Sequence, residues 1–183
     1  AAGRTGDPHR TAGTTSTAAA DATAANHAVA ATVDVWAGAA KPWHGLYVIT
    51  GIPSTDAREI WPIVAPMLDR VVDRYDPGYT TDDLLASVES QRMQLWVCVD
   101  NRIITACVVS EIQEYPRYRV FNLIAMAGDG MDKWFTPAFD VLEAYGKHHG
   151  CKYLSGSGRK GWVRQCRNRG YNEAFVVTRK ELI

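Results

Sequence analysis

The chain has 183 residues, of which 46% are apolar and 22% are charged, the balance of an ordinary globular protein of one domain. Its 20 basic and 20 acidic side chains cancel, which excludes a histone-like polycation and an acidic solvating tail. No stretch approaches the ~18 apolar residues that a membrane span needs, and no signal-peptide pattern opens the sequence. We therefore expect no membrane partner.

The cysteines are scattered, without CxxC or Cys/His spacing, at Cys98, Cys107, Cys151 and Cys166. This pattern predicts no metal site. It indicates reduced thiols in an intracellular compartment and leaves a single disulfide open.

The first part of the chain differs from the rest in composition. Residues 1–40 hold 15 alanines and 7 threonines, and their larger apolar side chains are few: Val29, Val33, Val35 and Trp36. Such a segment buries too little surface to offset the entropy of ordering it. We predict an Ala/Thr-rich extended arm or linker over residues 1–42 and a folded domain over 43–183. The arm is either a poorly held linker or a tether that orders on a partner.

The folded part begins with a β-branched and aromatic stretch, residues 46–52, which predicts a strand. Asp56 then opens an apolar helical stripe that runs from Ile60 to Tyr75. Pro62 and Pro66 are predicted to break or kink this helix near its start.

Thr80 is predicted to cap a short helix that carries Leu84, Leu85 and Val88. The remaining elements are bounded by turn signals. In chain order they are a hairpin (94–99 and 103–109), a strand (119–127), a long helix (131–149) stopped by Gly150, a strand (152–155), a helix (161–169) and a strand (174–178).

The predicted element order is therefore β-α-α-β-β-β-α-β-α-β. The strand–helix–strand unit over residues 119–155 needs a crossover, which makes its two strands parallel in an otherwise antiparallel sheet. We predict an α/β (α+β) domain with a mixed sheet and helices on both faces.

This order resembles the GNAT fold of acyl-CoA-dependent N-acyltransferases over nearly all of residues 46–183. The likeness lies in Tyr145-Gly-Lys-His-His-Gly-Cys-Lys-Tyr153, Gly158-Arg-Lys-Gly-Trp162 and Gly170-Tyr171, and it is strongest to a degenerate branch of the fold found in tailed phages. The resemblance implies an intracellular protein of the host cytoplasm or a component of the virion.

In active GNAT enzymes, backbone amides of a glycine loop after the fourth strand hold the pyrophosphate of acetyl-CoA. The matching segment here is Ala125-Met-Ala-Gly-Asp-Gly130, with alanine where glutamine or arginine is usual. Asp129 and Asp132 add negative charge, and Asp132 is also a candidate helix cap. A strand-to-helix turn that needs glycine is the alternative reading. The implied cofactor-binding residues are Ile124, Met126, Gly128, Asp129, Gly130, Met131, Lys133, Arg159 and Lys160.

The resemblance also implies two catalytic candidates. Cys166 stands four residues before Gly170, where the family often carries a tyrosine that protonates the leaving thiolate. A small buried hydrophobe packing its helix is the alternative role. Glu111 is the candidate general base, and it competes with Glu114 because strand alternation turns at most one of them toward a cleft. Solvated edge-strand charges are the default explanation for both.

Charge is separated along the folded part. Residues 144–172 carry seven basic side chains and no acidic one, whereas residues 54–90 carry eight acidic and three basic ones. The basic group centres on Arg159 and Lys160 in a glycine loop. CoA phosphates, nucleic-acid phosphates or an acidic protein surface fit it, as does a plain solubilising face.

Three functional hypotheses follow. The first is a non-catalytic or weakly catalytic phage virion or assembly component that contacts neighbouring subunits through its arm and charged faces. The second is an acetyl-CoA-dependent N-acyltransferase acting on a primary amine. The third is a nucleic-acid-binding module, which the sequence disfavours because no exposed aromatic residues alternate with the cations. The oligomeric state stays open.

Overall fold

A computed structural model describes residues 48–75, 78–158, 160–175 and 178–182. The predicted arm, residues 1–42, lies outside the described residues, as do the first residues of the predicted strand at 46–47. None of the described helices is both long and apolar enough to cross a membrane.

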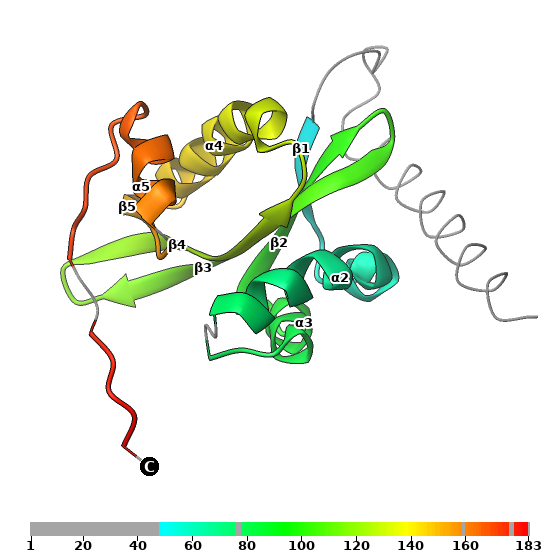
Figure 1. The fold of residues 1–183 in the computed structure, drawn as a ribbon, viewed down its shortest axis with the longest axis horizontal. Coiled ribbons are helices and arrows are strands. Elements are labelled where there is room, and N and C mark those ends of the chain that lie inside the picture. Colours follow the sequence, from blue (N-terminus) through cyan, green and yellow to red (C-terminus); the bar gives the residue numbers. More distant parts are fainter. Residues whose placement is uncertain (1–47, 76–77, 159, 176–177, 183) are drawn as a thin grey trace, which may run out of the picture.

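In the described residues, the domain is built on one five-stranded sheet whose strands lie side by side in chain order (Figure 1). The strands are β1 (Val48–Ile52), β2 (Met93–Asp100), β3 (Ile103–Tyr115), β4 (Tyr118–Gly128) and β5 (Cys151–Gly156). The first three neighbouring pairs are antiparallel and β4 pairs with β5 in parallel, so the predicted mixed sheet and its parallel pair are confirmed.

The predicted hairpin is formed by β2 and β3. Its two-residue turn places Asn101 and Arg102 at φ values of 47° and 68°, the left-handed geometry that suits the twist of paired strands. β3 runs further than predicted, to Tyr115, because it also pairs with β4 as far as Tyr118.

Helices cover both faces of the sheet, as predicted (Figure 1). On one face lie α2 (Ala57–Tyr75) and α3 (Thr81–Glu89), and on the other lie α4 (Met131–His148) and α5 (Lys160–Arg167). Each face has its own apolar core. Val64, Leu84 and Val97 belong to the first core, and Phe121 and Phe139 to the second.

The two prolines do not break α2, which is continuous from Ala57 to Tyr75. Pro62 and Pro66 are both exposed on the outer side of the helix. The carbonyl groups that lose their N–H partners at these positions can bond to water, which lowers the cost of a proline inside a helix. The predicted break is therefore wrong, and the alternative of a kink stays a prediction.

The predicted ends of the other helices are largely confirmed. Thr80 caps α3 through its hydroxyl, which accepts from the Asp83 N–H at 3.1 Å, and Asp83 accepts from the Thr80 N–H at 2.8 Å. This reciprocal pair is a capping box. After α4, Gly150 adopts φ +69°, the left-handed geometry that ends a helix.

The last predicted strand is wrong in the residues that the structure describes. Ala174, Phe175 and Thr178 are not in a strand, and 76% of the Phe175 surface is exposed. The β-branched pattern supplied the propensity for a strand, but a strand is stable only when it pairs and packs on a core.

Candidate functional site

The two parallel strands separate part-way along their length. β4 and β5 pair from Arg119 and Cys151 as far as Leu123 and Gly156, and β4 then continues to Gly128 paired with β3. Within the described part of the chain, the backbone groups of residues 124–128 that face β5 have no strand partner. A ligand placed between the strands can bond to these groups.

A tight turn follows the separated end of β4. Gly128 has φ +150°, and a Cβ atom there would lie 2.3 Å from the Ala106 Cβ and 2.6 Å from the Thr105 carbonyl oxygen. The next residue, Asp129, donates its N–H to that same carbonyl at 3.0 Å. Glycine is therefore required here by the close approach of β3, which is the alternative that the sequence left open for this segment.

α4 begins directly after the turn with an uncapped end. Its N-cap is Gly130, at φ +65° and without a side-chain cap, so the prediction that Asp132 caps this helix is wrong. Asp132 lies in the first turn instead, where its charge still favours the helix dipole. The amides at Gly130 and Met131 lie at the positive end of an 18-residue helix, and the exposed Lys133 lies two positions after Met131.

Two carboxylates stand at the same helix end. The Asp129 side chain is 82% exposed and lies 3.6 Å from an Arg70 guanidinium nitrogen. Its carbonyl oxygen accepts from the Trp134 indole N–H at 3.0 Å, which fixes the turn. Asp132 is exposed. Both charges oppose an incoming phosphate, but solvent screens them because they are exposed.

Glu111 lies close to the point where the strands separate. Strand pairing places Met93, Glu111, Asn122 and Ser155 in one row across β2, β3, β4 and β5, one pair before the last β4–β5 pair. Met93 packs in the α2/α3 core, so the row faces that side of the sheet. The Gln113 amide donates to Glu111 Oε2 at 3.0 Å, and Ser155 Oγ donates to Asn122 Oδ1, also at 3.0 Å.

Glu114, the competing candidate, is exposed near the end of β3, and strand alternation turns it to the face opposite Glu111. Its carboxylate pairs with Arg119 at 2.7 Å, both side chains being more than half exposed. The exposed ion pair agrees with the solvated charge that the sequence offered as the default explanation, but β3 is the central strand of the sheet and not an edge strand.

Cys166 lies on the opposite face of the sheet from Glu111. It is 5% exposed, within the core that α4 and α5 share, and burial raises the pKa of its thiol. The geometry agrees with the packing alternative, and a catalytic role for Cys166 stays a prediction. All four cysteines are free thiols, so the disulfide that the sequence left open is absent.

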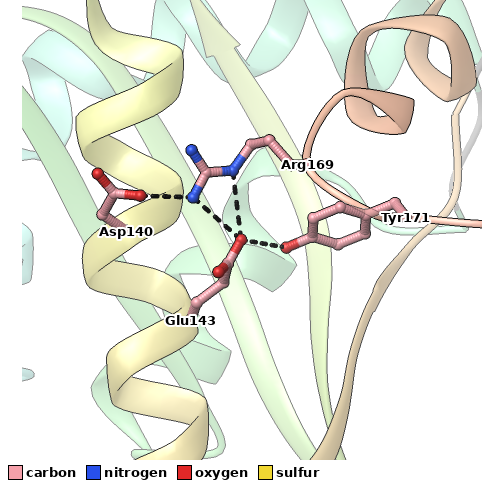
Figure 2. Close-up of polar contacts among 4 residues, drawn as sticks. All are labelled: Asp140, Glu143, Arg169 and Tyr171. Carbon is pink, nitrogen blue, oxygen red and sulfur yellow. Dashed lines mark hydrogen bonds and ion pairs between the residues drawn. The ribbon is translucent and has the colours of Figure 1, made fainter.

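A polar cluster that sequence reasoning missed fastens the chain after α5 to α4 (Figure 2). Arg169 lies 2.5 Å from Asp140 and 3.2 Å from Glu143, and the Tyr171 hydroxyl donates to the same Glu143 oxygen at 3.1 Å. Burial, followed by the Glu143 charge, raises the pKa of Tyr171. The spacing of Asp140 and Glu143 on one helix face was visible in the sequence, but their partner Arg169 lies 29 and 26 residues further along the chain.

Two predicted cofactor residues cannot be placed. Arg159 lies outside the described residues. Lys160 is the first residue of α5, and the structure describes only its backbone. Among the side chains that are described, no three potential metal ligands gather into a site.

The sheet order, the crossover through α4 and the separation of β4 from β5 define the GNAT fold. Solved structures confirm this: a GCN5-related N-acetyltransferase from Ralstonia eutropha has a TM-score of 0.58 at 11% identity, over 74% of this chain and 99% of its own. A predicted acetyltransferase with acetyl-CoA from Clostridium acetobutylicum has a TM-score of 0.55 at 13% identity, over 75% and 97%.

Glucosamine-6-phosphate N-acetyltransferase from Arabidopsis thaliana is also similar, with a TM-score of 0.54 at 12% identity, over 75% of this chain and 99% of its own. No protein-family model and no curated protein matches the chain. At these identities the likeness establishes the fold and leaves the activity to be argued from the site.

Proposed function

We propose that the chain binds acetyl-CoA where β4 and β5 separate and transfers the acetyl group to an amine. The observation that carries the proposal is the continuation of β4 past its last pair with β5, directly into an uncapped helix end. Unpaired strand amides and helix amides thereby adjoin each other. An acyl carbonyl oxygen and a phosphate group require donors of these two kinds.

The backbone of the turn fits the phosphates of acetyl-CoA, but two of its side chains carry charge of the wrong sign. The Gly130 and Met131 amides suit the pyrophosphate and Lys133 adds a cation, whereas Asp129 and Asp132 weaken the site electrostatically. The strand backbone around Ile124 and Met126 supplies donors for a carbonyl oxygen between the strands. Bound acetyl-CoA supplies an acetyl group activated as a thioester.

Glu111 is our candidate to accept a proton from the amine. It pairs with Asn122, close to where β4 and β5 separate, and its side chain lies on the α2/α3 face of the sheet. The amine nitrogen bonds to the acetyl carbon, the carbon–sulfur bond breaks, and the sulfur gains a proton. Cys166 occupies the family's position for that proton donor. Its raised pKa keeps the thiol protonated at neutral pH.

Calorimetric titration of the full chain with acetyl-CoA tests binding directly. We expect saturable binding in the micromolar range, together with release of free CoA when a primary amine is added. Absence of binding heat at low and at moderate salt would overturn the proposal. Binding without CoA release for a panel of amines would retain the site and overturn the transfer step.

Charge variants of the turn sharpen this test. Asp129→Asn and Asp132→Asn should each tighten acetyl-CoA binding by about two- to fivefold, the effect of one exposed charge. Asp82→Asn is the matched control. Asp82 also lies in the first turn of a helix, but that helix is α3 and not α4, so the variant should leave acetyl-CoA binding unchanged. If all three variants bind alike, the phosphates do not lie at the start of α4.

A role in assembly is the other hypothesis from the sequence. It rests on the arm over residues 1–42, which lies outside the described residues, and on the resemblance to tailed-phage proteins. It stays a prediction, and acetyl-CoA binding is the measurement that distinguishes it from the enzyme hypothesis.

A further inference from the structure

Three tyrosines gather on the sheet at the end opposite the candidate acetyl-CoA site. Tyr115 ends β3, Tyr118 begins β4 and Tyr153 lies near the start of β5, and they are 51%, 37% and 50% exposed. Ring centroids are 5.7 Å apart between Tyr115 and Tyr118 and 5.3 Å apart between Tyr118 and Tyr153. We call these three residues the tyrosine patch.

The patch lies on one face of the sheet, beyond its covering helices. Tyr115 pairs with Tyr118, and Tyr153 pairs with Val120, two residues further along β4, so the three rings share the face on which Glu111 lies. In Figure 1 this end of the β3–β4 hairpin extends away from α2 and α3. The rings therefore present a continuous aromatic surface that those helices leave open.

Cations border the patch. The Lys152 ammonium lies 5.5 Å from the Tyr118 ring centre and 5.2 Å from that of Tyr153. Arg117, exposed in the turn between β3 and β4, adds a second positive charge. The nearby Glu114 carboxylate is paired with Arg119. The surface is thus positive and aromatic together.

We propose that the tyrosine patch binds single-stranded nucleic acid, with bases stacking on the rings and phosphates held by Lys152 and Arg117. Sheet-borne aromatic side chains beside cations hold unpaired bases because every base has a face that can stack. The sequence disfavoured nucleic acid for want of aromatics among the cations, and that objection does not hold here. Tyr115 and Tyr118 lie outside the basic segment, and folding brings them to Lys152.

Fluorescence anisotropy of a short fluorescein-labelled oligothymidylate with the full chain tests the proposal. We expect the logarithm of the association constant to fall linearly with the logarithm of the salt concentration. The expected slope is about −1.4, the value for two phosphate contacts on a single strand. Tyr118→Ala and Tyr153→Ala should each weaken binding at least fivefold, since one stacked base contributes about that much or more. Tyr118→Phe and Tyr153→Phe retain the ring and should bind almost as the unaltered chain does.

Charge variants separate the patch from a general effect of charge. Lys152→Gln should reduce the slope by about 0.7, whereas Arg164→Gln, an equal change of charge on α5, should leave it unaltered. No oligonucleotide binding at low salt would overturn the proposal. Binding that Arg164→Gln weakens as much as Lys152→Gln, or that survives both alanine variants, would overturn it too.

Discussion

Replacing Gly128 by alanine tests the turn on which the candidate site depends. The new Cβ would lie 2.3 Å from the Ala106 Cβ and 2.5 Å from the Ala106 Cα, well inside the ~3.5 Å at which carbon atoms meet. The neighbours are a buried residue of β3 and its backbone, which cannot rotate away. Overpacking costs about 1–3 kcal/mol and the backbone conformation at φ +150° costs about 1–3 kcal/mol more.

We therefore expect Gly128→Ala to lower the free energy of unfolding by about 4 kcal/mol. Urea denaturation measures the change. Gly150→Ala is the matched control, because Gly150 also has a positive φ, +69°, but nothing lies within 4 Å of its added Cβ. Alanine there costs only about 1–2 kcal/mol, and the effect of the substitution on the unfolded chain is similar for both. If the two variants are equally stable, β3 does not approach Gly128 closely and the reasoning is wrong.

Two further predictions concern ionisable groups. Because the pKa of Tyr171 is raised in the folded state, the native protein keeps a proton that the unfolded chain releases above pH ~10. Stability should therefore fall as the pH rises past that value, by at most about 1.4 kcal/mol per unit, and Tyr171→Phe should remove this part of the pH dependence. Burial raises the pKa of Cys98 and Cys107 to about 12, and Cys166 is buried too. A thiol reagent should therefore label Cys151 first, and Cys151→Ser should abolish the fast phase of thiol labelling.

The parts of the fold that the sequence predicted well are those specified by neighbouring residues. The capping box of α3 needs only Thr80 and Asp83, and the hairpin needs a turn between two apolar runs. The parallel pairing of β4 with β5 follows from the length of the connection through α4. These signals are local, so a single sequence carries them.

The failures each needed information on burial. Pro62 and Pro66 are tolerated because both lie on the exposed side of α2, and residues 174–178 have strand propensity, although their described members lie outside the sheet. Arg169 finds Asp140 and Glu143 only through the packing of the chain after α5 on α4. Propensity cannot supply these facts, because tertiary contacts decide them.

The candidate site illustrates the same limit. The sequence predicted Glu111 and Cys166 as catalytic residues of one reaction, but the structure places them on opposite faces of one sheet. A continuous sheet would separate such groups completely, because its hydrogen-bonded strands leave no passage. Only beyond Leu123 and Gly156, where β4 no longer pairs with β5, do the two faces adjoin. If the chain transfers acetyl groups, the reacting carbon must therefore lie between the separated ends of β4 and β5. An engineered disulfide that joins these two ends should abolish acetyl transfer and leave oligonucleotide binding at the tyrosine patch unchanged.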